Sequence, residues 1–218
     1  CPWRNVVKRL VIPLICLLLQ ACSPSTKGLG KSLWQSVSGE SGVQLTDDEI
    51  QTMPYASQYM QLNGGPQIFV VLAYSEEGQQ KWLTQDRAML VTQHGRLVKT
   101  QLAGDNLLTV NNLDNDPLAH PNQITDGTRW TRTMGWTEHQ QVRYATATST
   151  FRWDGSDTLT IGSESTAVRV LEEEVTTSEA HWRNRYWVDS DGQIRQSEQY
   201  LGAGTFPVKT TLIKAAKS

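Results

Sequence analysis

The side chains best suited to covalent chemistry, the cysteine thiols, lie in one short stretch of this 218-residue chain. Cys1, Cys16 and Cys22 all fall within the first 22 positions. A thiol can form a disulfide, bind zinc or an iron–sulfur cluster, or act as a nucleophile. The residues after Cys22 therefore carry no disulfide, no cysteine metal site and no CxxC redox pair.

Histidine, serine and glycine patterns also predict no catalytic or cofactor site. No two of the four histidines have metal-ligand spacing, and no serine lies in a GxSxG motif. Gly30, Lys31 and Ser32 are typical of the end of a phosphate-binding loop, but Ser25 occupies the position of that loop's first glycine. We therefore predict no catalytic residue, no metal, no other cofactor and no bound nucleotide. A Ser–His–Asp triad assembled from distant residues stays open as an alternative.

Three consecutive carboxylates occur at Glu172, Glu173 and Glu174, within a predicted strand. Side chains alternate along a strand, so Glu172 and Glu174 share one face and Glu173 lies on the other. The favoured interpretation is an exposed or edge strand that like charges keep from pairing with other chains. In the alternative, one carboxylate points into a cavity. Glycoside hydrolysis would need two facing carboxylates, and no such pair can be identified.

Tryptophan provides the best candidate for ligand binding, because the chain has eight tryptophans and only three phenylalanines. Indole rings can stack on sugars, and they also fill protein cores. Core packing is the favoured role for each ring, and a glycan-binding platform made by a few of them is the alternative to test. The candidate glycan-binding residues are Trp130, Trp136, Trp153, Trp182, Tyr186 and Trp187.

Composition excludes several classes of protein. The chain is 38% hydrophobic and 19% charged, with a net charge of −2, which excludes a disordered polyelectrolyte and a multi-span membrane protein. Binding to nucleic acid needs clustered Lys and Arg, and the chain has no basic run. We therefore expect no nucleic-acid partner.

The N-terminus has the pattern of an export signal. Arg4, Lys8 and Arg9 precede a largely apolar segment at residues 10–19, which is too short for the ~20 residues that span a bilayer. Leu19, Gln20, Ala21 and Cys22 then resemble the lipobox of bacterial lipoproteins. We predict a signal peptide at residues 1–21, recognised through Leu19 and Ala21 and cleaved before Cys22.

This resemblance makes Cys22 the predicted lipidation site. Acyl chains such as palmitate, on the thiol and on the new N-terminus, would anchor the protein stably, because several acyl chains bind a membrane stably whereas a single chain binds it only marginally. Ser23 follows in place of the aspartate that signals inner-membrane retention, which implies sorting to the outer membrane. The mature chain has 17 basic and 22 acidic residues, a net charge of −5.

Residues 22–44 are predicted to form a flexible lipidated tether, and residues 45–218 a single, mainly β domain. Thr46 is a good N-cap for a short helix that Pro54 ends. Turn residues separate short apolar or alternating runs, which predict an antiparallel meander in a barrel, half-barrel or sandwich. The predicted strands are residues 55–62, 67–74, 88–93, 96–102, 107–110, 129–136, 141–153, 158–161, 168–177, 181–188, 193–200 and 207–214.

Two breaks stand out in this pattern. Residues 111–128 contain many Asn, Asp, Gly and Pro residues and predict a long, functional or mobile loop, the one plausible division between two halves. Asp154 and Gly155 predict a turn between two strands.

The C-terminal region carries a distinctive pattern. It comprises Asn184, Arg185, Tyr186, Trp187, Val188, Asp189, Gly192, Ile194, Ser197, Gln199, Tyr200 and residues 202–212. These residues resemble the signature of the YjbF/GfcB family of lipoproteins, encoded with group 4 capsule and exopolysaccharide genes in enteric bacteria. The lipobox, the short helix and the strand at Phe69 and Val70 follow in similar order. Many relatives have Gly-Pro where this chain has Gly202 and Ala203, which puts a local turn in doubt.

The resemblance implies a large antiparallel sheet, curved like a half-barrel around a helix, with a short N-terminal helix. It also implies a lipid-anchored outer-membrane protein that faces the periplasm. The first hypothesis is a non-enzymatic accessory in exopolysaccharide or capsule production or export, which binds glycan or an export-machinery protein. The alternatives are a carrier of lipid or lipid-linked saccharide on the concave sheet, or a polysaccharide-modifying enzyme.

Overall fold

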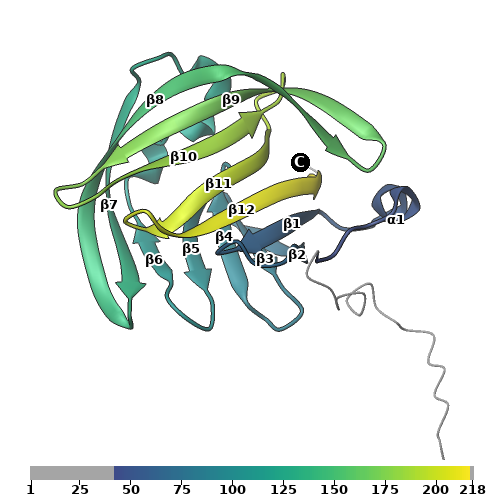
Figure 1. Ribbon diagram of the computed structural model, residues 1–218, viewed down its shortest axis with the longest axis horizontal. Helices are drawn as coiled ribbons and strands as arrows, with labels where there is room; N and C mark the ends of the chain where they lie inside the picture. Colours follow the sequence, from purple (N-terminus) through teal and green to yellow (C-terminus); the bar gives the residue numbers. More distant parts are fainter. Residues whose placement is uncertain (1–41, 217–218) are drawn as a thin grey trace, which may run out of the picture. The chain divides into compact units, whose positions relative to one another are not determined.

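A computed structural model describes residues 42–216, which form one antiparallel sheet of twelve strands and confirm the mainly β prediction (Figure 1). The strands are β1 (Ser57–Leu62), β2 (Ile68–Glu76), β3 (Gln79–Leu83), β4 (Met89–Gln93), β5 (Arg96–Gln101), β6 (Leu107–Val110), β7 (Arg129–Glu138), β8 (Gln141–Ile161), β9 (Glu164–Thr176), β10 (His181–Val188), β11 (Ile194–Gly202) and β12 (Thr205–Lys214). Their order in the sheet is β5-β4-β3-β2-β1-β12-β11-β10-β9-β8-β7-β6. The predicted signal peptide, Cys22, the glycine motif near Gly30 and most of the predicted tether lie outside the described residues.

The sheet curls into a nearly closed barrel, because β5 and β6 occupy opposite ends of the strand order and yet lie next to each other. Side chains join them. The Asn106 amide oxygen accepts hydrogen bonds from the Thr100 hydroxyl and the Leu102 backbone N–H, at 2.9 and 2.6 Å. The Thr100 hydroxyl in turn accepts from the Leu107 N–H at 3.0 Å. The hydrogen bonds of this seam satisfy polar groups that an open sheet edge would leave exposed.

Inward-facing residues of most strands fill the barrel. The larger apolar cluster includes Met60, Trp82, Leu90, Trp136 and Trp182. A second cluster packs Phe151, Leu171 and Tyr186 against Leu118 and Ile124 of the long connection between β6 and β7. That connection, predicted as a functional or mobile loop and as the one plausible division between two halves, therefore packs into the barrel. It contains three short 3₁₀ turns, η3 (Leu113–Asn115), η4 (Pro117–Ala119) and η5 (Pro121–Gln123).

The predicted short helix is confirmed as α1 (Asp47–Thr52). Its first turn has a capping box, in which Thr46 and Glu49 bond each other's backbone N–H groups. None of its residues is buried, and Asp47 and Ile50 lie against Gly162 at the tip of the β8–β9 hairpin (Figure 1). The sheet therefore does not curve around this helix, and the long connection adds Leu118 of η4 and Ile124, just after η5, to the apolar side chains inside the sheet. No helix within residues 42–216 has the length and apolar character to cross a membrane.

Three local predictions change. The pattern gave no strand at residues 79–83, but β3 forms there between β2 and β4. The turn predicted at Asp154 and Gly155 is a bulge within the continuous strand β8. Val43, placed in the tether, is buried, and its N–H donates to the Gln67 carbonyl at 2.7 Å, so ordered structure begins before the predicted boundary at residue 45.

Gly202 shows why a glycine stands in the signature region. A Cβ atom at this position would lie 2.3 Å from the buried Trp136 indole. We expect Gly202→Ala to lower the free energy of unfolding by ~1–3 kcal/mol, because a rigid ring has to shift inside a packed core. Urea unfolding followed by tryptophan fluorescence measures this loss. Gly104→Ala is the matched control, since no atom lies within 4 Å of its added Cβ; equal stability of the two variants would contradict the packing argument.

Candidate functional site

The most concentrated group of ionisable side chains lies inside the barrel, around Glu173. Arg96 on β5 pairs with Asp116, which lies between η3 and η4. The Nη1 atom of Arg96 also lies 3.0 Å from the Glu173 carboxylate. Arg132 on β7 approaches the other Glu173 oxygen at 3.5 Å. All four side chains are buried, and the two cations balance the two anions. We call these four residues the buried ion network.

Neutral side chains complete the bonding of Glu173. The Tyr186 hydroxyl and the Asn184 amide donate to one of its oxygens at 2.8 and 3.0 Å. Ser149 donates to the other oxygen. The guanidinium groups of Arg96 and Arg132 both lie over the Trp130 ring, at 4.4 and 4.5 Å from its centroid. The network and the neutral side chains bonded to it therefore link β5, β7, β8, β9, β10 and the long connection across the barrel.

Electrostatics keep this network charged. Burial alone would raise the pKa of Glu173, but Arg96 and Arg132 outweigh burial and hold it far below its ordinary value. Burial opposes the charge on Arg96 too, yet Asp116 and Glu173 hold its pKa well above the usual range. Burial, reinforced by Glu173, raises the pKa of Tyr186. An enclosed, ionised carboxylate cannot donate a proton to a substrate, so the network is suited to holding strands together.

The favoured prediction for the three glutamates is wrong. β9 lies between β8 and β10 and is not an edge strand, and Glu172 and Glu173 are both buried. Alternation does place them on opposite faces. Glu173 points inward, as the alternative proposed, but it meets arginines there. Glu172 faces outward beneath the guanidinium groups of Arg152, Arg183 and Arg185.

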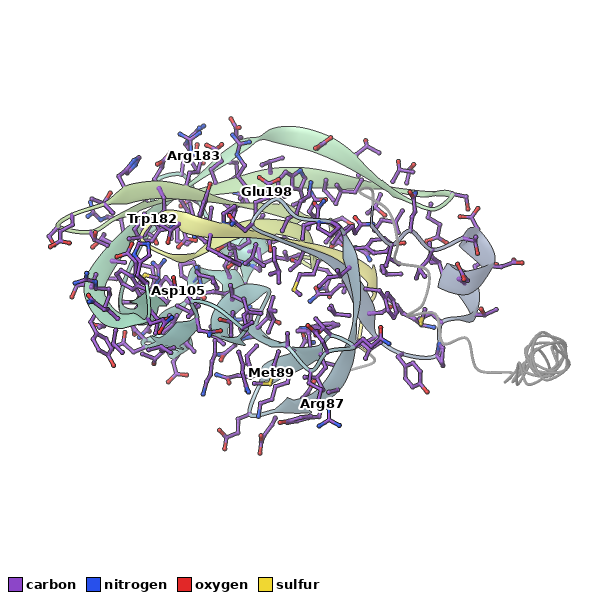
Figure 2. The ribbon with its side chains drawn as sticks, turned by 60° about the horizontal axis from the view of Figure 1, so that its bottom comes forward. Arg87, Met89, Asp105, Trp182, Arg183 and Glu198 are labelled. Atoms are coloured by element: carbon purple, nitrogen blue, oxygen red, sulfur yellow. The ribbon has the colours of Figure 1, made fainter. Side chains whose placement is uncertain are left out.

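The outer face around Glu172 is a cross-strand charge ladder. Its members, at directly opposed positions on β8 to β12, are Arg152, Glu172, Arg185, Glu198 and Lys209. Opposite charges on opposed residues stabilise a sheet. Figure 2 shows Arg183 and Glu198 on the outer side of the sheet, with Trp182 turned inward.

The six candidate glycan-binding residues fall into two groups. Trp130, Trp136, Trp182 and Tyr186 are buried in the two apolar clusters or against the buried ion network. Trp153 is half-buried and stacks on Arg169, whereas Trp187 is buried and its indole bonds Asp157. Two of the six therefore contact residues that line a surface cleft, and glycan binding by the five buried residues stays a prediction that their burial does not favour.

The cleft lies between the β8–β9 hairpin and the β10–β11 turn, and its volume is about 750 Å³. We call it the hairpin cleft. Its lining comprises Asn122, Ser156, Asp157, Thr158, Ala167, Val168, Arg169, Val188, Asp189 and Ser190. The Arg169 guanidinium stacks 3.7 Å from the centroid of the Trp153 ring, and the Trp187 indole donates to Asp157 at 3.0 Å. The cleft thus combines hydroxyls, carboxylates and a cation with apolar side chains.

The enclosed cavity beside Arg96 and Asn184 measures about 20 Å³, comparable with one water molecule and far below the several hundred Å³ that a lipid needs. Within residues 42–216, no group of three or more His, Cys, Asp or Glu residues is arranged to hold a metal ion.

Comparison with known proteins identifies the family of this chain. Residues 30–213 match the family model described as group 4 capsule polysaccharide lipoprotein gfcB, YjbF. The chain belongs to this family. It is 74% identical to the uncharacterized lipoprotein YjbF of Escherichia coli (strain K12), over 97% of this chain and all of that protein. It is 43% identical to the uncharacterized lipoprotein GfcB of the same strain, over 96% of this chain and all of GfcB.

A solved relative has the same fold. The crystal structure of the hypothetical lipoprotein YmcC from Escherichia coli (K12) superposes with a TM-score of 0.76 and is 48% identical. The match covers 80% of this chain and 91% of YmcC. These relatives confirm the YjbF/GfcB resemblance, and the family is one of lipoproteins associated with capsule polysaccharide.

The C-terminal signature of this YjbF/GfcB chain has a structural explanation. Asn184 and Tyr186 bind Glu173, and Gln199 bonds the backbone of Gly95 and Leu97 on the far side of the barrel. Asp189 accepts hydrogen bonds from two backbone N–H groups of the β10–β11 turn. The signature residues therefore close the barrel and shape the wall of the hairpin cleft.

Sequence reasoning missed Arg96, Asp116 and Arg132. For Glu173 a signal existed, because Leu171 and Val175 share its strand parity and are apolar, which marks an inward face. For Arg96 and Asp116 none existed, since 77 residues separate Arg96 from Glu173 and nothing local predicts their contact.

Proposed function

We propose that this protein is a lipoprotein anchored in the outer membrane through Cys22, facing the periplasm, and that it serves capsule or exopolysaccharide production or export by binding glycan without catalysing a reaction. The observation that carries the proposal is the hairpin cleft, in a family associated with capsule polysaccharide. Its polar groups can exchange hydrogen bonds with sugar hydroxyls.

Arg169 is the central residue of this cleft. The Trp153 ring stacks on the Arg169 guanidinium and holds it at one wall of the cleft. Because the side chain is already ordered, it loses less conformational entropy when a ligand binds. A planar guanidinium presents several donors in a fixed arrangement, which suits sugar hydroxyls and carboxylates. Ser156, Thr158 and Ser190 add hydroxyls around it.

We expect Arg169→Gln to weaken binding to the extracellular polysaccharide of the producing strain by about tenfold, equivalent to roughly 1.4 kcal/mol. The lipidated protein, purified in detergent, is titrated by calorimetry, and tryptophan fluorescence provides a second signal. Arg143→Gln is the control, because Arg143 lies on the surface at the far end of β8.

The outcomes separate the candidate roles. Binding by the wild-type protein that Arg169→Gln weakens and Arg143→Gln leaves unchanged supports the proposal. Absence of binding to any polysaccharide, together with specific capture of an export protein, would overturn the glycan proposal in favour of an adaptor. Turnover of the polysaccharide by the purified protein would contradict a non-enzymatic role.

A further inference from the structure

The outer face of β7, β8 and β9 carries rows of threonine hydroxyls. Thr131 and Thr148 are directly opposed, as are Thr133 and Thr146, and Thr148 is also opposed to Thr176 on β9. The hydroxyl oxygens of Thr131 and Thr148 lie 3.2 Å apart. Neighbouring strands are ~4.8 Å apart, and alternate residues along a strand lie ~6.8 Å apart. The hydroxyls therefore form a regular, uncharged array.

Part of this array is hollowed into a groove of about 530 Å³, which we call the threonine groove. It is lined by Arg129, Thr146, Thr148, Thr150, Thr176, Thr177 and Ser178. Six of these seven residues carry a hydroxyl, which can both donate and accept hydrogen bonds. Such a lining matches a partner whose own surface is covered with hydroxyls.

The charge in the threonine groove is positive. Arg129 is its one ionisable lining residue, and among residues 42–216 no carboxylate lies within ion-pair distance of it. The nearest acid in the sheet register is Glu174, opposite Thr150, and its carboxylate is already engaged by Arg183 and His181. The guanidinium of Arg129 is therefore available to an anionic group on a ligand.

An exposed aromatic ring extends the array beyond the threonine groove. Tyr144 is two residues from Thr146 on the same face of β8 and is 65% exposed. Its ring packs over Gly135, where an added Cβ would lie 2.5 Å from a ring carbon. Val142, the next outward residue, is 55% exposed. A flat, exposed tyrosine ring can stack on a sugar.

We propose that this face binds an extended strand of acidic polysaccharide, with a sugar stacked on Tyr144, hydroxyls bonded along the threonine groove and a carboxylate at Arg129. The inference rests on the proposed glycan function and adds a second binding surface to the hairpin cleft. It also specifies the ligand class, since the only charge in the groove calls for an anion.

The test uses alginate as a polymer of uronic acids, dextran as a neutral polymer and glucuronate as the free acid. Lipidated protein in detergent is titrated with each. We expect alginate to bind, with dextran and glucuronate at least tenfold weaker, and added salt to weaken alginate binding. Tyr144→Ala, Arg129→Gln and Thr146→Val should each weaken alginate binding several-fold with unchanged circular dichroism.

Each failure points to a different conclusion. Alginate binding that survives all three substitutions but is lost in Arg169→Gln would overturn this inference and leave the hairpin cleft as the glycan site. Equal binding of glucuronate and alginate would indicate a simple anion site and also overturn it. Absence of binding to every polymer, including the polysaccharide of the producing strain, would contradict the proposed function itself. Concentration-dependent dimerisation lost in Tyr144→Ala, without polymer binding, would identify the face as a self-association surface.

Discussion

Glu173→Gln should destabilise the domain by ~3–5 kcal/mol, because it removes one partner of a buried ion pair and leaves the other charged. Arg96 keeps Asp116, but Arg132 loses its carboxylate inside the barrel. A loss of this size is a large share of the ~5–15 kcal/mol that stabilises an ordinary domain. Chemical unfolding at pH 7, followed by tryptophan fluorescence, measures it.

Glu174→Gln is the matched control on the same strand. Its carboxylate lies on the outer face, is partly exposed and pairs with Arg183, whose side chain is 43% exposed. Exposed ion pairs contribute little. If Glu173→Gln cost no more stability than Glu174→Gln, the buried ion network would not be what links the two sides of the barrel.

Glu173→Gln should also alter how the free energy of unfolding depends on pH. The pKa of Glu173 is lowered on folding from an ordinary value near 4.5. Its contribution is therefore complete above pH 4.5 and is lost as the pH falls below that value, because the unfolded chain then binds a proton that the folded one resists. We expect the wild-type protein to lose stability more steeply than Glu173→Gln between pH 5 and pH 3, and parallel curves would contradict this assignment.

Cys22→Ala should release the protein from the membrane fraction almost completely. The predicted lipid on Cys22 is the proposed anchor, because several acyl chains bind a bilayer stably. Without them, the protein has only an acidic net charge, which does not favour binding to anionic lipids. Fractionation of cells followed by immunoblotting measures the shift. Loss of labelling by a palmitate analogue should accompany it.

Cys16→Ala provides the control for this release. Cys16 lies in the predicted signal peptide and should leave with it, so its loss should change neither localisation nor labelling. Continued sedimentation of Cys22→Ala with the outer membrane would overturn the anchor proposal, and release of the Cys16→Ala protein would place the processing site elsewhere.

Most strands could be predicted from the chain because alternation and turn residues are local signals. The hairpin of β10 and β11 around Gly192 follows directly from such a pattern. β3 could not be predicted, since Gln79–Leu83 is mostly polar and becomes a strand through pairing on both sides. The bulge near Gly155 was missed because a turn and a bulge use the same residues.

The binding surfaces were less predictable than the strands. Indole rings were the natural candidates, yet five of the six predicted aromatic residues are buried, because large rings contribute most when removed from water. The residues that shape the surfaces, such as Arg169, Arg129 and Tyr144, belong to common types whose role depends on what surrounds them.

The amino-acid sequence was enough to identify the family and the mainly β class; it shows that no cysteine follows Cys22, and it predicts an export signal with a candidate lipid site. These features depend on local residue order. The near closure of the sheet, the contacts of Glu173 with Arg96 and Arg132 inside it, and the exposure of Tyr144 beside a groove of threonines became visible only in the folded structure. Those features depend on contacts between residues far apart in the chain, and such contacts form only when the curled sheet brings its distant strands together.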